Sequence, residues 1–211
     1  MLIARNGKRP RVHASAQIAA SATIVGDVKI AARAYVDHGA VIESSGPPIE
    51  IAKEAIVFAG AVVRSVGGSS RPAFPVVIGK GTLVSPLSIL TGCRVGADCY
   101  LATAAIILQG ATIGDHVRVG AGAIVHATTV LPDRARVGMR HVAMPTAEGF
   151  LSTADIERAR EAIAALEFFE TAFDASESDQ EQLHIQAIAS LLEEVHGWRD
   201  ESIDEHEHQA R

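Results

Sequence analysis

The sequence predicts a mainly β protein, a solenoid of stacked parallel coils followed by a C-terminal α-helical extension. Three observations predict it: aliphatic residues recur every six positions, small residues and glycines stand between them, and from about residue 152 the apolar spacing becomes helical. A period of six fits neither an α-helix, with about 3.6 residues per turn, nor a two-sided strand, with a period of two. It fits short flat strands joined by tight corners.

The repeat is clearest over residues 75–96, where Ile78, Val84 and Leu90 are six apart and glycines mark the corners. The other members are Val12, Ile18, Ile24, Ile30, Val36, Ile42, Ile51, Val57, Val63, Val95, Leu101, Ile107, Ile113, Val119, Val125, Leu131 and Val137. Three strands would close a triangular coil of about eighteen residues, and stacked coils would bury a column of these side chains. A β-sandwich would need longer strands with period-two alternation.

Composition limits the class of protein. The 211 residues are 48% hydrophobic but only 4% aromatic, which suits a narrow core of small aliphatic side chains. A net charge of -6 and the absence of a basic stripe argue against a nucleic-acid partner. The start of the chain has no apolar signal core and no later run is long enough to span a bilayer, so we expect a cytoplasmic protein without a membrane partner.

Two cysteines, Cys93 and Cys99, lie one period apart. They are expected on successive strands of the coil and not facing each other. We interpret them as reduced, mostly structural thiols.

Two segments break the six-residue period. The first is Ser44 to Pro48; the second, Ser65 to Pro75, is rich in Gly, Ser and Pro and predicts a loop that leaves the coil. Such a loop either tolerates insertion or lines a site. The expected organisation is a β-helix domain over residues 1–148, C-terminal helices over 149–198 and a flexible tail over 199–211.

The helical pattern begins near Ser152 or Thr153, either of which could cap the first helix, with Asp155 and Glu157 in its first turn. Its apolar stripe is Ile156, Ile163, Leu166, Phe169 and Phe173. A second stripe comprises Leu183, Ile188, Leu191, Leu192, Val195 and Trp198. We expect these helices to cover the open end of the coil or to pack along it and its neighbour.

The repeat region resembles the gamma-class carbonic anhydrase family. The resemblance covers roughly residues 9–145 and rests on the opening RP at residue 9, the GDV at residue 26, the GAV at residue 39 and a nearly gap-free match through residues 78–114. It implies a hexapeptide-repeat, left-handed parallel β-helix that forms a homotrimer. It also implies sites between subunits, because in that family three histidines from two subunits hold one zinc ion.

The zinc ligands do not carry over. The three matching positions are Arg64, Pro86 and Thr91; neither Pro nor Thr is a usual zinc ligand, and Arg stays protonated and repels a cation. The family's other polar site residues are also replaced, at Glu43, Ser44, Ser45, Ile56 and Phe58. We therefore predict no metal ligands, no zinc cofactor and no CO2 hydration at this site.

A different polar column is predicted in its place. Glu43, Arg64 and Thr91 should occupy the same corner position on successive coils, with Gln109 continuing the column and His126 a further candidate. Arg64 could present its planar guanidinium to an anionic small molecule, with Thr91 and Gln109 as further ligand-binding residues. Alternatively, Arg64 and Glu43 form an ion pair at the trimer interface.

Histidines supply the other candidates for catalysis. His38 and Glu43 repeat the family's five-residue ligand spacing, which is compatible with a relocated metal site, an acid–base pair or an ordinary exposed histidine. His116 and His126 are also candidates, because acyltransferases of this architecture use a single histidine to deprotonate the acceptor.

Three functions follow from these alternatives. The first is a zinc-free, carbonic-anhydrase-like trimer with a binding or assembly role. The second is an enzyme that uses Arg64, Glu43 and His38 or His126 on an anionic substrate at the subunit interface. The third is a hexapeptide-repeat acyltransferase. The sequence alone leaves open whether the protein is an enzyme.

Overall fold

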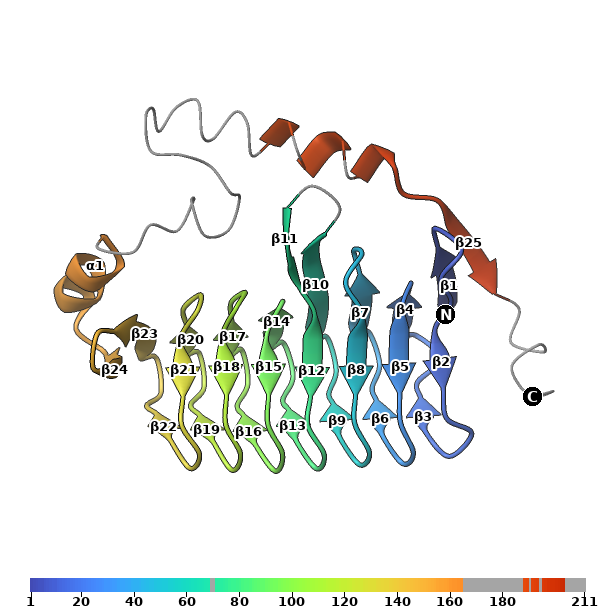
Figure 1. Cartoon of the computed structure of the whole chain (residues 1–211). Coiled ribbons are helices and arrows are strands. Elements are labelled where there is room, and N and C mark those ends of the chain that lie inside the picture. Colours follow the sequence, from blue (N-terminus) through green and yellow to red (C-terminus); the bar gives the residue numbers. More distant parts are fainter. Residues whose placement is uncertain (69–70, 165–187, 190, 194, 204–211) are drawn as a thin grey trace.

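The computed structural model describes residues 1–68, 71–164, 188–189, 191–193 and 195–203. Their main part is a left-handed parallel β-helix, in which three sheets wind around one axis and successive coils stack side by side (Figure 1). The fold class predicted from the six-residue repeat is therefore confirmed.

We call the three sheets A, B and C. Sheet A contains, in spatial order, β24 (Gly149–Thr153), β23 (Val142–Thr146), β20 (Ile124–Val125), β17 (Ile106–Ile107), β14 (Ile89–Thr91), β10 (Val62–Gly68), β7 (Val41–Ser44), β4 (Thr23–Val25), β1 (Leu2–Arg5) and β25 (Asp200–Ile203), with β11 (Arg71–Phe74) beside β10. Sheet B contains β2 (Arg11–Val12), β5 (Val28–Ile30), β8 (Ile49–Ile51), β12 (Val76–Ile78), β15 (Arg94–Val95), β18 (Thr112–Ile113) and β21 (Val130–Leu131). Sheet C contains β3 (Gln17–Ile18), β6 (Tyr35–Val36), β9 (Ile56–Val57), β13 (Leu83–Val84), β16 (Tyr100–Leu101), β19 (Arg118–Val119) and β22 (Arg136–Val137).

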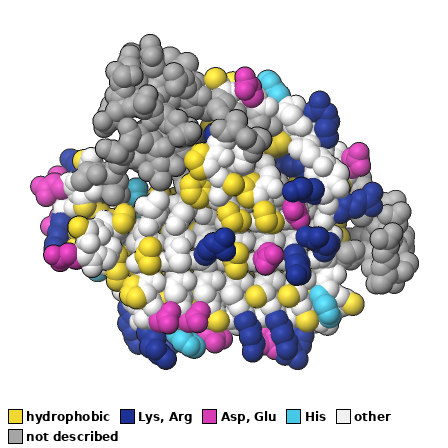
Figure 2. Space-filling view, in the orientation of Figure 1, with side chains coloured by type: hydrophobic (Ala, Val, Ile, Leu, Met, Phe, Trp, Pro, Cys, Tyr) yellow, Lys and Arg dark blue, Asp and Glu magenta, His cyan; other side chains and the backbone are white. Residues whose placement is uncertain are grey.

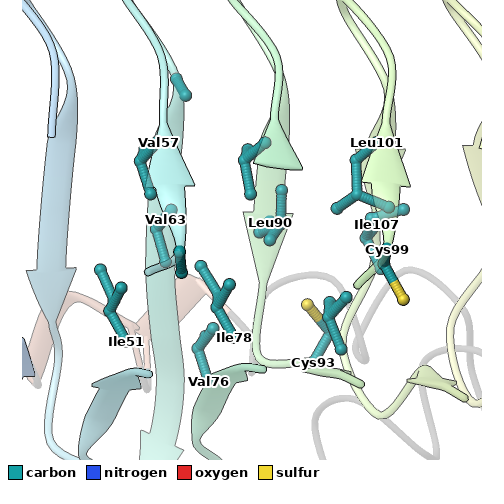
Figure 3. Packing of buried hydrophobic residues seen from close by; sticks show 14 of the residues in the cluster. Ile51, Val57, Val63, Val76, Ile78, Leu90, Cys93, Cys99, Leu101 and Ile107 are labelled. Carbon is teal, nitrogen blue, oxygen red and sulfur yellow. The ribbon is translucent and has the colours of Figure 1, made fainter. Parts of the chain in front are cut away.

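The repeat residues form the core. Every predicted member from Ile24 to Val137 is buried, whereas Val12 and Ile18, in the first coil, are partly buried. Figure 3 shows Val63, Leu90 and Ile107 following one another on successive strands of the interior. From Ile24 on, the repeat residue of each strand is therefore buried, and β5, β8 and β12 each bury a second aliphatic side chain.

Both cysteines are free and buried in this core (Figure 3). Burial raises the pKa of the Cys93 thiol to about 12 and also raises the pKa of Cys99. The Cys99 thiol lies 3.1 Å from the Gly114 carbonyl oxygen, to which it donates. These are the features of structural thiols.

Glycine is required where the corners stack. A Cβ atom added to Gly79 would lie 2.2 Å from the carbonyl oxygen of Gly96, and one added to Gly96 would lie 2.6 Å from that of Gly114. Successive coils can approach at this corner only because these residues have no side chain.

The two interruptions have different structures. Residues 45–48 make a short bulge, in which the hydroxyls of Ser44 and Ser65 both donate to the Pro47 carbonyl oxygen, at 2.9 and 2.6 Å. The predicted loop at 65–75 is largely a β-hairpin, because β10 continues to Gly68 and pairs antiparallel with β11. A Cβ atom on Gly67 would meet the Pro72 carbonyl, so this glycine permits the close pairing.

The C-terminal extension begins with a strand and not with a helix. β23 and β24 form an antiparallel hairpin that closes the last coil, and α1 (Ile156–Ala164) follows at that end of the β-helix (Figure 1). Asp155 is the N-cap, because its Oδ1 accepts from the backbone N–H groups of Glu157 and Arg158. The prediction of Ser152 or Thr153 as the cap was wrong by two or three residues, since both belong to β24.

The end of the described chain also differs from expectation. Asp200–Ile203 lie within the predicted flexible tail, yet they form β25, which pairs antiparallel with β1 at the opposite end of the β-helix from α1 (Figure 1). The pairing satisfies the free edge of β1. Of the predicted apolar stripes, Ile156, Ile188, Leu191, Leu192 and Val195 are exposed. Leu166, Phe169, Phe173 and Leu183 lie outside the described residues.

Candidate functional site

The predicted polar column lies on the strands of sheet A. Arg64 on β10 is directly in register with Glu43 on β7 and with Thr91 on β14, as the sequence predicted. Gln109 is not in this column. Because Leu90 pairs with Ile107, the residue in line with Thr91 is Leu108, and Gln109 lies beside Gly92.

The misplacement of Gln109 has a simple cause. The inward residues Leu90 on β14 and Val95 on β15 are five residues apart, whereas Ile107 on β17 and Ile113 on β18 are six apart. One coil is therefore a residue shorter than the next, and counting along the sequence shifts the column by one. Val125 pairs with Ile107, which places His126 in line with Leu108 and returns a polar residue to the column.

Glu43 has a partner that the sequence did not predict. The Nη1 atom of Arg5 donates to its Oε1 at 2.5 Å, whereas Nε of Arg64 lies 3.8 Å from its Oε2. Arg64 instead donates from Nε to the Ser45 hydroxyl at 3.1 Å. The expected pair of Glu43 and Arg64 is therefore only the outer part of a larger network.

Arg5 is the centre of this network. It is only 8% exposed and makes a bidentate ion pair with Asp200, with Nε to Oδ1 at 2.6 Å and Nη2 to Oδ2 at 2.7 Å. Its guanidinium carbon lies 3.8 Å from the centroid of the Trp198 ring, and that of Arg64 lies 5.5 Å from the same centroid. The hydrogen bond to Asp200 is the main cause that raises the pKa of Arg5, and the hydrogen bond from Arg5 holds the pKa of Asp200 below its usual range.

The positions that match the family's zinc ligands do not fit a zinc ion. Arg64 and Thr91 lie side by side on β10 and β14, and Pro86 lies on the corner between sheets C and A. A guanidinium, a hydroxyl and a proline supply none of the nitrogen, sulfur or carboxylate ligands that zinc needs. Within the described residues, no three His, Cys, Asp or Glu side chains gather where they could hold a metal ion.

His38 lies on the same corner between sheets C and A, two coils before Pro86. Its side chain is exposed, and its Nδ1 is 2.8 Å from the Ser21 hydroxyl on the preceding coil. Asp37 accepts from the His38 backbone N–H, which is the largest cause lowering the pKa of Asp37. These contacts fix the conformation of the corner. Because Nδ1 faces Ser21, Nε2 is the ring nitrogen of His38 that points away from Ser21.

The other two histidines occupy different environments. His126 is buried directly after β20 of sheet A, and burial lowers the pKa of its imidazole. His116 is half-exposed on a corner between sheets B and C, with Nδ1 4.0 Å from a carboxylate oxygen of Asp98. Neither lies on the corner that carries His38 and Pro86.

The three corners of the β-helix differ in charge. The corners between sheets B and C carry Arg33, Lys53, Glu54, Lys80 and Asp98, and Figure 2 shows charged side chains gathered along the lower edge of the molecule. Four corners between sheets C and A, at residues 58–61, 85–88, 102–105 and 120–123, carry no charged residue, whereas the corner at 37–40 carries Asp37 and the corner at 138–141 carries Arg140. Leu87, on one of them, is 62% exposed with a φ of 61°.

The outer face of sheet A carries an apolar column beside the polar column of Glu43, Arg64 and Thr91. The apolar column comprises Val41, Val62, Ile89, Ile106, Ile124 and Val142, which lie in one register. The equivalent column on sheet B includes Arg11, Lys29, Glu50 and Arg94. An uncharged corner beside an apolar sheet face is the composition expected of a subunit interface.

Comparisons with known proteins support the fold. No protein-family model and no curated protein matches the chain. Among solved structures, a Bacillus cereus protein described as a candidate acetyltransferase matches with a TM-score of 0.55 at 20% identity, over 89% of this chain and 93% of that one. A hexapeptide transferase family protein from Anaplasma phagocytophilum matches with a TM-score of 0.34 at 19% identity, over 88% and 93% of the two chains.

A third structure is the UDP-N-acetylglucosamine O-acyltransferase LpxA from Moraxella catarrhalis, with a TM-score of 0.43 at 17% identity, over 89% of this chain and 90% of that one. At these identities the comparisons establish the hexapeptide-repeat β-helix and nothing finer. They do not single out the gamma-class carbonic anhydrases. Among the described helices, none is long and apolar enough to cross a membrane.

Proposed function

We propose that the protein is a homotrimeric acyltransferase, which transfers an acyl group from a thioester to a hydroxyl or amine in a cleft between subunits. The observation that carries the proposal is the placement of His38, an exposed imidazole oriented through Nδ1 by Ser21 on a corner between sheets C and A. The β-helix shared with a candidate acetyltransferase supports the reaction class by analogy.

The trimer is supported by surface chemistry. Trimer formation would bury the apolar column of sheet A and the corners between sheets C and A. The charged outer face of sheet B would remain exposed to solvent. Leu87 adds to this argument, because its side chain is exposed on one of these corners and a subunit contact would bury it.

The resemblance noted in the sequence implies that residues at the ends of the sheet A strands face the corner of a neighbouring subunit. In that arrangement, the partner subunit's His38 would lie opposite the column that contains Glu43, Arg64 and Thr91. Arg64 has a half-exposed side chain and donates to Ser45 through Nε, so its two terminal nitrogens can bind an anionic group of the acceptor.

The chemical step needs one base. Nε2 of His38 takes the proton from the acceptor while its oxygen or nitrogen attacks the thioester carbonyl carbon. The tetrahedral intermediate then collapses, the carbon–sulfur bond breaks, and the thiolate leaves and takes the proton from His38. No metal ion takes part, in agreement with the poor zinc-binding chemistry of Arg64, Pro86 and Thr91.

The test is acetyl transfer from acetyl-coenzyme A to a panel of amines and alcohols, with products detected by mass spectrometry. We expect His38→Gln to lower the rate by about a hundredfold or more, since general-base catalysis contributes about that much. His116→Gln is the matched control, on a different corner, and should retain the wild-type rate. Equal losses in both variants, or no loss in either, would reject His38 as the base.

A role in assembly or ligand binding without catalysis is the second candidate. One observation favours it: the network of Arg5, Glu43 and Asp200 uses the polar column to hold the C-terminal strand in place. If that is the column's only role, Arg64→Ala will weaken the trimer or loosen β25, and wild-type protein will release no thiol from acetyl-coenzyme A.

A further inference from the structure

Two exposed arginines occupy adjacent positions on the outer face of sheet C. Arg118 on β19 is directly in register with Arg136 on β22, and Tyr100 on β16 precedes them in the same column. All three side chains are exposed, and their neighbours Leu101, Val119 and Val137 point into the core. We call this column the arginine ladder.

The ladder brings like charges together. Adjacent parallel strands are about 4.8 Å apart, so the two side chains leave the backbone close to each other, and like charges directly opposite one another destabilise a sheet. Three arginines elsewhere in the β-helix have carboxylate partners: Arg5 pairs with Asp200, Arg11 with Asp27, and Arg33 with Glu54. Within the described part of the chain, neither Arg118 nor Arg136 forms an ion pair.

The nearest acidic residues in the sequence do not neutralise the ladder. Asp115 and Asp133 precede the two arginines by three residues, but each directs Oδ1 to a backbone N–H group, of Ala97 at 2.7 Å and of Asp115 at 2.8 Å. These carboxylates fix the corners between sheets B and C. The ladder is therefore a pair of guanidiniums with ten donor N–H groups and no counter-charge from the described chain.

A diphosphate fits this arrangement. Each guanidinium presents a planar fork that matches the oxygens of one phosphate group, and two forks on neighbouring coils match two linked phosphates. Tyr100 adds an aromatic ring, 46% exposed, one coil further along. An exposed ring beside a phosphate site can stack on a nucleobase.

We infer that Arg118 and Arg136 bind the diphosphate of a nucleotide-containing ligand, and that Tyr100 packs against its base. The inference rests on the proposed function only for which substrate of the acyl transfer carries the diphosphate. That substrate is either a nucleotide-linked thioester donor or a nucleotide-linked acceptor. The binding experiment distinguishes these two ligands.

The experiment is calorimetric titration of full-length protein at low salt with ADP, inorganic pyrophosphate, coenzyme A and UDP. We expect ADP to bind more tightly than pyrophosphate, and the double variant Arg118→Gln/Arg136→Gln to weaken ADP binding about tenfold or more. Arg94→Gln is the matched control, because Arg94 is an exposed strand arginine on sheet B. It should change ADP affinity less than twofold.

Tyr100→Ala separates base from phosphate recognition. It should reduce ADP affinity to that of pyrophosphate and leave pyrophosphate binding unchanged. The inference is overturned if wild-type protein binds neither ADP nor pyrophosphate at millimolar concentration, or if the double variant and Arg94→Gln lose affinity equally.

The source of the ligand follows from the same titrations. Tighter binding of coenzyme A than of UDP assigns the ladder to the thioester donor, and the reverse assigns it to the acceptor. If ADP binding depends on the ladder but no acyl transfer is found, the diphosphate site stands and the proposed function fails.

Discussion

Arg5 and Asp200 lie 195 residues apart in the sequence and form a bidentate ion pair that joins the first and last strands of sheet A. The arrangement covers the edge of β1, which would otherwise offer unpaired backbone groups to another chain. Trp198, the only tryptophan in the chain, stacks on the same guanidinium and can report on this closure.

Closure of β25 is predicted to depend on pH. The pKa of Asp200 is lowered in the folded chain, so its contribution is present above the unfolded value of about 3.8 and is lost as pH falls below it through the folded value. Tryptophan fluorescence should therefore change below about pH 4. Because Asp200 is 41% exposed, we expect Asp200→Asn to lower the free energy of unfolding by only about 0.5–1 kcal/mol. At pH 7 the variant should show the tryptophan fluorescence spectrum that the wild-type protein shows in acid. An unchanged Asp200→Asn spectrum at pH 7 would contradict the role of the pair.

The buried column is predicted to dominate stability. Leu90 is fully buried on β14, so Leu90→Ala should lower the free energy of unfolding by about 2–5 kcal/mol, through lost burial and a cavity. Thr112→Ala, on the exposed face of β18, is the control and should change stability by less than about 0.5 kcal/mol. Denaturant unfolding followed by circular dichroism measures both, and similar losses would contradict the assignment of inward and outward faces.

The apolar face of sheet A is predicted to hold the trimer. Ile89 is 39% exposed in the single chain, and Ile89→Glu would place a charge in the interface, where desolvation is costly. Sedimentation should then give a species near the subunit mass of 22.2 kDa, whereas wild-type protein gives about three times that mass. Thr112→Glu on sheet B should stay trimeric. A wild-type monomer would remove the basis of the inter-subunit cleft.

The two thiols are predicted to be inert in the native protein. With a pKa of about 12 for Cys93 and a raised pKa for Cys99, almost no thiolate exists at pH 8, and burial blocks access. A chromogenic thiol reagent should label neither cysteine in buffer and both in denaturant. Rapid labelling of native protein would show that the coils near residues 93–99 open readily.

Most of the β-helix could be predicted because its signal is local and repeated. One aliphatic residue in six fixes the inward face of each strand, and the register of Glu43, Arg64 and Thr91 follows from counting coils. Counting failed at Gln109, because Leu90 and Val95 are five residues apart whereas Ile107 and Ile113 are six apart. A coil of about eighteen residues leads from Thr91 to Gln109, but this coil is one residue shorter and puts Leu108 in line with Thr91.

The network around Arg5 could not be predicted in this way. It depends on the antiparallel pairing of β1 with β25, and the sequence DESI in β25 carries neither alternation nor a repeat that would mark it as a strand. Similarly, the hairpin of β10 and β11 contains the Gly, Ser and Pro residues of a loop, and its pairing is set by contacts across the turn. Long-range contacts of this kind leave little trace in a single sequence.

The central claim is that the reactive site is assembled from two subunits, and complementation tests it most directly. His38→Gln and Arg64→Ala would each lower acetyl transfer strongly in a pure trimer, by about a hundredfold or more for His38→Gln. After unfolding and co-refolding at equal concentrations, about one quarter of the clefts would combine an intact His38 with an intact Arg64 from a neighbour. The account predicts recovery of about that fraction of wild-type activity, and no recovery in mixed trimers would contradict it.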